Sequence, residues 1–437
     1  MIPIISTTLD NYLNPVYTYE VLFSNESLNQ LMILTMSTKN SEYKNASRKA
    51  YHLTTEQRDT YRKISQESFR LKKRASLGLL SRVHSVNTPQ LDPNDFMPQL
   101  KSNNLTTLSL FSGGGGLDLG FDKAGYIHQG AYEIIPICGE TLKNNRPNWT
   151  IHSGPENGDV TQIKWQDNIG SIDVIHGGPP CQPFSIAGQQ EGQNDDRNMW
   201  SEFIRAVNII KPKSFVAENV LGLLNPKFRG FVQEHILDKL PDYHLLMFEL
   251  NAANFGVPQI RRRVFFVGFR TLADLKNLKI PQPTHISSEL EITRFDNVCR
   301  TNDLFENTLP KTMGVRKALG LPDIGYDSLA PTLRSAFTGK RNTTSVLNSS
   351  AGQKAWGNIG IWPNGVQANR DKASAFPAKY DHFRLSVQDC ALLQGFPENW
   401  RFAGAVYQVL GQIGNSVAPP IAYQVAKAVA LALSSKP

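Results

Sequence analysis

Cys181 stands where a nucleophile could act on a bound substrate. The apolar run Ile172 to Ile175 predicts a short buried strand, and the two glycines and two prolines at 177–180 fix the backbone between that strand and the cysteine. In an open α/β sheet, ligands bind at the carboxyl ends of the strands. A polar, glycine-containing segment, 182–198, follows. An isolated Pro-Cys pair is more often a structural thiol, so the nucleophile hypothesis depends on the rest of the chain.

A glycine-rich segment, Phe111 to Asp118, offers a site for a cofactor. It directly follows the apolar run that begins at Leu105, which predicts the first strand of a sheet. Glycines at this point allow a ligand to approach the backbone at the start of a helix. Gly113 and Gly115 match the beginning of a dinucleotide fingerprint, but Asp118 occupies the place of its third glycine. This difference counts against NAD or FAD.

Two acidic residues at predicted strand ends could bind the remainder of such a cofactor. Glu133 ends the predicted strand that begins at Ile127, about twenty residues after the glycines, where a carboxylate can accept hydrogen bonds from a ribose. Asp159 occupies the analogous point after a third strand and could accept a hydrogen bond from an adenine amino group. The alternative for Asp159 is that it caps a turn.

Short apolar runs alternate with helical patterns over the segment that carries these groups. Such alternation predicts a doubly wound, Rossmann-like α/β sheet. We expect an N-terminal extension at 1–104, a catalytic and cofactor-binding core at 105–270, a smaller irregular recognition domain at 271–410 and a segment at 411–437 that packs back on the core. The predicted strands are Leu105 to Phe111, Ile127 to Glu133, Ile172 to Ile175, Phe215 to Glu218, Tyr243 to Leu250 and Val264 to Phe269.

Six motifs, in their order along the chain, resemble those of the cytosine-5 DNA methyltransferases of prokaryotic restriction-modification systems. The resemblance covers nearly everything from Leu105 to the C-terminus. Its motifs are Phe111-x-Gly113-x-Gly115, Glu133 with Asp159, Gly178-Pro179-Pro180-Cys181-Gln182, Glu218-Asn219-Val220, Gln259-x-Arg261-x-Arg263, and the series from Arg384-Leu385-Ser386 through Gln394-Gly395-Phe396-Pro397 to Gly411-Gln412-Ile413-Gly414-Asn415-Ser416-Val417-Ala418-Pro419-Pro420.

The resemblance implies methyl transfer from S-adenosylmethionine to C5 of a specific cytosine in double-stranded DNA, which protects host DNA from a cognate restriction endonuclease. Cytosine C5 is a poor nucleophile, so an enzyme must first add a thiolate at C6, and Cys181 takes that role. Glu218 would contact N3 and the exocyclic amine, while Arg261 and Arg263 would hold the base and Glu218. The implied cofactor-binding residues are Phe111, Gly113, Gly115, Leu117, Glu133, Asp159, Asn415 and Ser416.

Other interpretations of these residues are structural. Glu218 could simply close a strand, and the run Arg261 to Arg263 could be a solvated basic segment. The family order of the motifs favours the functional interpretation for both. Arg262, the unmatched middle residue, is expected to face solvent or phosphate.

Two segments contain candidates for contacts with DNA. A base inside a duplex must be flipped out before a cysteine can reach it, and we expect Ser185, Gln189 and Arg197 to contact the opened stack or its backbone. Solvation of this loop is the equal alternative. In the recognition region, the segments around 330–333 and 362–365 resemble those of enzymes that modify GGNCC- or GGWCC-like sites. Base edges or phosphates there could be reached by Arg334, Lys340, Arg341, Asn342 and Arg370.

The net charge of +8 comes from one segment of the chain. Between Lys44 and Arg82 there are eleven Lys or Arg residues against three acidic ones, so the other residues are formally neutral together. Thr54 and Gln57 predict a capping box before a basic helix. A polyanion-binding arm and a charged helix that packs on the body of the protein are equally consistent with this pattern.

The remaining composition indicates a cytoplasmic enzyme without a metal site. The chain has 437 residues, enough for two or three domains, and no uninterrupted apolar run approaches the roughly 20 residues that cross a membrane. The N-terminus lacks the basic region of a secretory signal. Because the four cysteines, Cys138, Cys181, Cys299 and Cys390, form no Cys-x-x-Cys pair, neither zinc nor disulfides are expected. We expect a monomer.

Two other functions stay open from the sequence. A catalytically silent DNA-binding regulator would not need Cys181, Glu218 and the glycine segment together. An RNA cytosine methyltransferase of the unrelated type would carry a second cysteine near a Pro-Cys pair, and it would not need the long region after Phe269.

Overall fold

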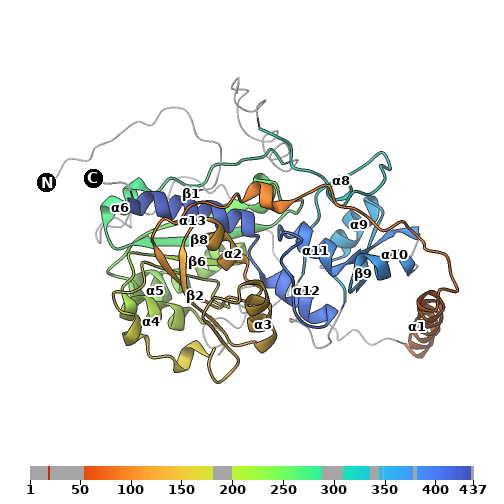
Figure 1. Cartoon of the computed structure of the whole chain (residues 1–437), viewed down its shortest axis with the longest axis horizontal. Coiled ribbons are helices and arrows are strands. Elements are labelled where there is room, and N and C mark those ends of the chain that lie inside the picture. Colours follow the sequence, from red (N-terminus) through yellow and green to blue (C-terminus); the bar gives the residue numbers. More distant parts are fainter. Residues whose placement is uncertain are drawn as a thin grey trace.

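The computed structural model describes residues 18–19, 54–180, 199–287, 309–334, 344–347, 349–376 and 381–434. A sheet-based core occupies one end of the molecule, and a smaller region around α8 to α10 occupies the other (Figure 1). Helices α11 (Val387–Leu393) and α12 (Val406–Asn415) lie between them.

Within the described residues the core is an eight-stranded sheet with the order β1-β7-β8-β6-β5-β2-β3-β4. Five neighbouring strands are parallel: β2 (Thr106–Leu110), β3 (Ile127–Glu133), β4 (Ile151–Ser153), β5 (Val174–Gly177) and β6 (Ser214–Val220). Strand β8 (Arg262–Phe269) is antiparallel to β6 and to β7 (His244–Asn251), which also pairs with β1 (Thr18–Tyr19). The doubly wound α/β fold is confirmed, and each predicted strand matches an observed one to within two residues.

Alternating side chains of the strands divide the core into two buried clusters. On β6, Phe215 and Ala217 join the cluster formed with α4 (Trp200–Ile210) and α5 (Arg229–His235), while Val216 joins the cluster on the other face. That other face is covered by α2 (Gly116–Lys123), α6 (Leu272–Asn277) and α13 (Pro419–Ser434). Successive residues of a strand point to opposite faces, so a sheet covered on both sides needs apolar residues at consecutive positions.

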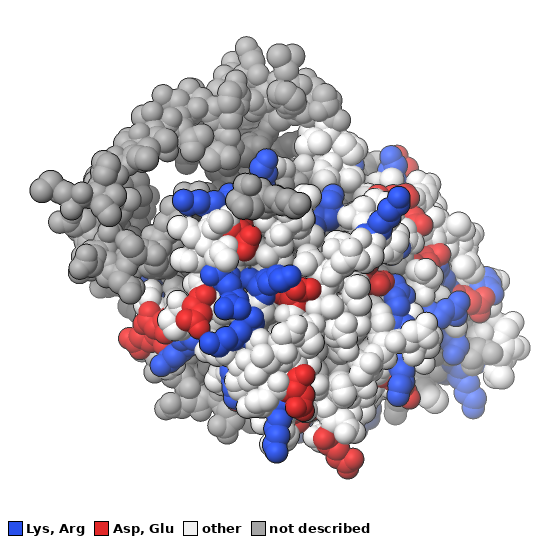
Figure 2. All heavy atoms as spheres, turned by 60° about the vertical axis from the view of Figure 1, so that its left-hand side comes forward, with Lys and Arg blue, Asp and Glu red and all other residues white. Residues whose placement is uncertain are grey.

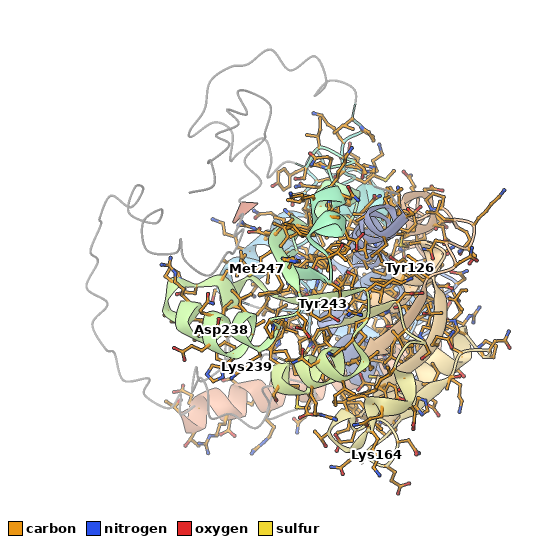
Figure 3. All side chains as sticks on the ribbon, turned by 90° about the vertical axis from the view of Figure 1, so that its left-hand side faces the viewer. Tyr126, Lys164, Asp238, Lys239, Tyr243 and Met247 are labelled. Carbon is orange, nitrogen blue, oxygen red and sulfur yellow. The ribbon has the colours of Figure 1, made fainter. Side chains whose placement is uncertain are left out.

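Helix α13 is held tightly against α2. A Cβ added to Gly120 would lie 2.5 Å from Cβ of Ala422, so glycine is needed for this close approach. The Tyr126 hydroxyl, labelled in Figure 3, donates to the Ala426 carbonyl at 3.0 Å. These contacts hold the C-terminal helix against α2 of the core.

One stretch of the described residues, Val406–Ser434, is long and apolar enough to cross a membrane by length and composition alone. It consists of two helices, α12 and α13, and 67% of its most apolar part is buried inside the protein. Burial against α2 and the sheet explains its composition as that of a core helix.

The region after the core is more regular than the sequence analysis predicted. Helix α6 lies beyond residue 270 but belongs to the core, because it contacts β7, β8 and α13. Helix α3 (Pro136–Asn145) is also part of the core. Beyond α6, β9 (Ile361–Gln367) and β10 (Phe383–Ser386) form a parallel two-stranded sheet. The buried apolar residues of the region beyond α6, such as Trp356 and Ile361, are too few and too widely spaced to give a clear periodicity in the sequence. The domain boundaries themselves stay a prediction. The helices of this region are α8 (Val315–Ala318), α9 (Ser350–Asn358) and α10 (Arg370–Ala375).

Helix α1 (Thr55–Ser76) confirms the predicted basic helix, and it stands away from the body in Figure 1. Its contact with the rest of the described structure is with α10. Phe69 is 70% exposed. The face of the core in Figure 2 has acidic and basic side chains interspersed, in agreement with a formally neutral body and a charge surplus in the N-terminal segment.

Candidate active site

The order in which the chain adds strands to the sheet reverses between β2 and β5. From β2 it proceeds to β3 and β4 on one side, and later from β5 to β6 on the other. Leu110 at the end of β2 pairs with Gly177 at the end of β5, so the glycine segment and the residues leading to Cys181 begin side by side. Such a switch point is where open α/β sheets bind ligands. The sequence prediction of one shared site is therefore supported by the topology.

The glycine segment turns sharply and is tied to Glu133. Phe111, Gly113 and Gly115 all have positive φ angles, of 56°, 55° and 83°. Glu133 accepts hydrogen bonds from the backbone N–H of Gly113 at 2.7 Å and of Ile135 at 2.8 Å, one on each carboxylate oxygen. Burial raises the pKa of Glu133, and these two bonds oppose the increase. Each oxygen retains a lone pair that could accept from a ribose hydroxyl.

The C-terminal motif packs directly behind the glycine segment. A Cβ on Gly114 would lie 2.8 Å from Oγ of Ser416, and one on Gly116 would lie 2.2 Å from the Val417 carbonyl oxygen. The Trp400 indole N–H donates to the Gly114 carbonyl at 3.1 Å. A side chain at Gly114 or Gly116 would displace the segment, so this packing explains why both positions are glycine.

The residues assigned to the cofactor differ in their surroundings. Leu117 and Ser416 are buried, whereas Asn415 is exposed. Asp159 caps a 3₁₀ turn, since one of its oxygens accepts from the N–H and the hydroxyl of Thr161 at 3.0 and 2.8 Å. The capping interpretation of Asp159 is confirmed, and its contact with adenine stays a prediction.

The backbone that leads to Cys181 lies against β6. Cys181 itself, with Ser185, Gln189 and Arg197, falls outside the described residues. The Asn219 side-chain amide donates to the Pro179 carbonyl at 3.1 Å. A Cβ on Gly178 would be 3.2 Å from Oε2 of Glu218.

Glu218 and Arg263 form a buried ion pair at 2.7 Å, with side chains 9% and 12% exposed. Strands β6 and β8 bring them together, because Val220 pairs with Arg263 in this antiparallel ladder and Glu218 is the next residue on the same face. Burial raises the pKa of Glu218, while the charges of Arg263 and Arg261 oppose the increase. A carboxyl group in this position retains its proton to higher pH than one in water.

Arg261 differs from Arg263 in what it holds. It is fully buried, and its Nη2 donates to the carbonyls of Gly414 and Ser416 at 2.9 and 2.7 Å. The expectation that both arginines hold Glu218 is therefore correct in geometry only for Arg263. Nε and Nη1 of Arg261 have no hydrogen-bond partner among the described residues. Arg262 forms an ion pair with Glu249 on β7, so its side chain is occupied within the sheet.

Glutamines link the distant motifs to one another. Gln259, fully buried, donates to the Leu393 carbonyl and to the Gln394 side chain at 3.0 and 2.8 Å. Gln394 in turn donates to the Ser416 carbonyl at 2.7 Å, the atom that also accepts from Arg261. These bonds fix the C-terminal motif against β8. Gln259, Gln394, Asn219 and Gln412 stand within motifs in the sequence, but nothing local indicates these hydrogen bonds, and Trp400 has no signal beyond its residue type.

Few of the proposed DNA-binding residues can be placed. Arg334 is exposed, with Nη1 donating to the Leu347 carbonyl at 3.3 Å. Lys340, Arg341 and Asn342 fall outside the described residues. Arg370 forms ion pairs with Asp389, at 2.8 Å, and with Glu398, and its contact with DNA stays a prediction.

The sequence profile of the C-5 cytosine-specific DNA methylase family matches residues 105–430. The chain belongs to this family. The type II methyltransferase M.NgoMIV of Neisseria gonorrhoeae is 32% identical over 343 residues, covering 76% of this chain and 99% of that protein. M.Eco47II of Escherichia coli is also 32% identical, over 76% of this chain and 80% of its own. A solved E. coli structure, of a putative DNA modification methyltransferase encoded within a prophage, is 25% identical with a TM-score of 0.48, covering 76% of this chain and all of that one.

The chain is thus a DNA (cytosine-5-)-methyltransferase of the type found in restriction-modification systems, and its methyl donor is S-adenosylmethionine. The glycine segment at 111–117, here called the cradle, and the buried Glu133 carboxylate fit this donor. The cradle allows close approach to the backbone, and the carboxylate can accept hydrogen bonds from ribose hydroxyls. Among the described residues no group of three or more His, Cys, Asp or Glu side chains could hold a metal ion.

Proposed function

We propose that the enzyme methylates C5 of one cytosine in a specific duplex sequence through a covalent adduct with Cys181, and so protects host DNA from a cognate restriction endonuclease. The observation that carries this mechanism is the Glu218–Arg263 pair, which lies beside the backbone leading into Cys181. We also propose that the enzyme acts as a cytoplasmic monomer and flips its target base out of the duplex.

The roles of the residues follow from the chemistry of cytosine. The Cys181 thiolate attacks C6, and electron density moves toward N3, where protonated Glu218 donates its proton. When bound, S-adenosylmethionine supplies the methyl group to C5. The 111–117 segment and Glu133 would hold this cofactor. A base from solvent takes the C5 proton, and the electrons of that C–H bond re-form the C5–C6 double bond as Cys181 leaves as a thiolate. N3 returns its proton to Glu218. Arg263 fixes one carboxyl oxygen of Glu218 throughout.

Bisulfite sequencing of DNA from cells that express the protein tests this function. The expected result is 5-methylcytosine at one position of a short recurring sequence, and GGNCC- or GGWCC-like sites are the proposed targets. Loss of methylation with retained DNA binding would indicate a silent regulator. Methyl transfer to RNA and not to DNA would also contradict the proposal.

The cofactor segment gives a test that does not depend on DNA. Gly115→Ala is expected to weaken S-adenosylmethionine binding about tenfold or more, because the new Cβ would lie 2.6 Å from the Trp400 ring and push the segment out of place. Gly170→Ala is the matched control. Gly170 also has a positive φ, of 77°, but it has no atom within 4 Å of the added Cβ. Calorimetric titration measures both, and equal affinities would show that the cradle does not bind the donor.

The basic helix α1 is proposed to bind DNA phosphates without reading sequence. Replacing its basic residues by glutamine should lower DNA affinity and flatten its dependence on salt, by about 0.9 in logarithmic slope per lost phosphate contact. Lys164→Gln with Lys239→Gln is the control, because both lysines are exposed on the core (Figure 3). An unchanged slope would mean that α1 is only a solvated helix. The residues to be replaced are Arg58, Arg62, Lys63, Arg70, Lys72, Lys73 and Arg74.

A further inference from the structure

Residues 82–101, here called the strap, connect α1 to the first strand of the core and touch both ends of the molecule. They precede residue 105, where the match to the family begins. In Figure 1 the strap is the orange chain that passes from the region of α10, along the upper side, to the core. Nothing in the shared motifs accounts for its contacts.

The first half of the strap binds the recognition region. Arg82 forms an ion pair with Asp371 at 2.6 Å and donates to the Ser374 hydroxyl at 2.7 Å. Farther along, the buried Asn87 side-chain amide donates to the Leu319 carbonyl at 3.1 Å and to Oδ1 of Asp389 at 3.0 Å. Asp389 belongs to the capping box of α11, so Asn87 links α8 and α11.

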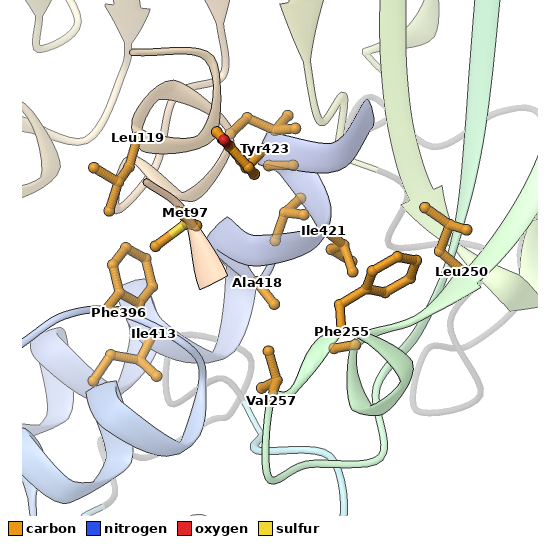
Figure 4. Close-up of a cluster of buried hydrophobic side chains, with 14 of the residues drawn as sticks. Met97, Leu119, Leu250, Phe255, Val257, Phe396, Ile413, Ala418, Ile421 and Tyr423 are labelled. Atoms are coloured by element: carbon orange, nitrogen blue, oxygen red, sulfur yellow. The ribbon is translucent and has the colours of Figure 1, made fainter. Parts of the chain in front are cut away.

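The second half of the strap is anchored in the core. Met97 is fully buried, and Figure 4 shows it among Leu119, Phe396 and Tyr423. The Tyr423 hydroxyl donates to the Pro98 carbonyl at 3.0 Å. The backbone N–H of Leu100 donates to the Lys123 carbonyl at 2.9 Å. A single short segment is therefore bound to α2 and α13 at one end and to α8, α10 and α11 at the other.

Three glycines outside the strap are shaped to receive it. A Cβ on Gly320 would lie 1.9 Å from the Thr88 carbonyl oxygen, and one on Gly125 would lie 2.2 Å from that of Lys101. A Cβ on Gly256 would be 2.6 Å from the Phe96 ring. All three have positive φ angles. Contacts this close at three separate glycines show that the strap packs tightly against the rest of the protein. A segment lying loosely on the surface would tolerate side chains at these positions.

We propose that the strap fixes the recognition region relative to the catalytic core, and that Asn87 is a positioning residue for DNA methylation. This inference rests on the proposed function. A target base that is recognised in one region and attacked in the other must arrive at Cys181 in register, and a misplacement of about 1 Å can cost about 100-fold in rate. The strap reduces such misplacement because it joins the two regions by a separate stretch of chain, through contacts with α8, α10 and α11 at one end and with α2 and α13 at the other.

Gly320→Ala tests the proposal, with Gly325→Ala as its matched control. Gly325 lies five residues on, with a φ of 80°, but no atom lies within 4 Å of its added Cβ. Both variants therefore carry the same backbone strain, and only Gly320→Ala displaces the strap. We expect Gly320→Ala to raise KM for the cognate duplex about tenfold while the Kd for S-adenosylmethionine changes less than about twofold. Gly325→Ala should retain the wild-type KM.

Hydrogen exchange supplies a readout that does not depend on catalysis. In Gly320→Ala, amides of β9, β10 and α10 should exchange faster, while those of β2, β5 and β6 should keep their protection. Should Gly320→Ala lose cofactor binding, Asn87→Ala decides by the same two measurements, because it removes only two hydrogen bonds. Equal KM values and equal exchange in the glycine pair would overturn the strap proposal. A wild-type protein that does not methylate DNA would overturn the proposed function instead, and the exchange result would still judge the strap.

Discussion

Cys181→Ser is expected to lower methyl transfer by at least about 10⁴-fold, because a serine hydroxyl is almost never ionised at neutral pH and cannot add to cytosine C6 as a thiolate does. S-adenosylmethionine binding should persist, since the cradle is built from 111–117 and Glu133. Single-turnover transfer of a labelled methyl group to duplex DNA measures the first effect, and calorimetric titration measures the second.

Cys390→Ala is the matched control for this thiol. Cys390 is fully buried in α11, where burial raises its pKa, so it cannot act as a nucleophile. Its removal should leave methyl transfer within about threefold of wild type, because it creates only a small cavity. Near-normal activity of Cys181→Ser would refute the covalent mechanism.

A duplex with 5-fluorocytosine at the target position extends the same prediction. Fluorine at C5 cannot be lost as a proton is, so the bond between the cysteine sulfur and C6 cannot be released. Wild-type protein should form a covalent complex stable to denaturation, with DNA attached to Cys181. A complex trapped through a different residue would reassign the nucleophile.

The placements within the candidate site that could be expected from sequence are those of residues at strand ends. Glu133 ends a strand, and Gly113 follows the neighbouring strand, so parallel pairing of β2 with β3 brings them within hydrogen-bond distance. Glu218 meets Arg263 for a comparable reason, since two paired strands carry them on one face. In each case a short motif at a strand end and the expected sheet were sufficient.

The parts that sequence reasoning missed depend on partners far apart in the chain. The ion pairs of Arg370 with Asp389 and Glu398 are not expected from the sequence, because these partners lie 19 and 28 residues farther along the chain. Trp400 contacts the glycine segment only because the chain folds back onto Gly114. The strap is the extreme case, because Gly125, Gly256 and Gly320 are ordinary turn glycines in the sequence, and only the tertiary structure shows that one segment passes over all of them.

Glu218→Gln is expected to lower methyl transfer about 10²- to 10⁴-fold, the usual contribution of a positioned general acid. Glutamine has nearly the shape of glutamate and can still hydrogen-bond, but it has no proton to transfer to N3. Burial already raises the pKa of Glu218, against the charges of Arg263 and Arg261, which favours the protonated form that donates to N3. Single-turnover rates measure the loss, and thermal unfolding shows whether the variant remains folded.

Glu249→Gln provides the control, because the chain places a second carboxylate against the adjacent arginine. Glu249 pairs with Arg262 toward the surface, whereas Glu218 pairs with Arg263 in the interior. Both substitutions remove one glutamate charge from an ion pair between neighbouring strands, but the Arg262 side chain is 45% exposed, so water can solvate its charge when Glu249 is replaced. Glu249→Gln should therefore retain wild-type turnover. Equal turnover in the two variants would show that the proton of Glu218 is not used, and that its place beside the Cys181 segment is structural.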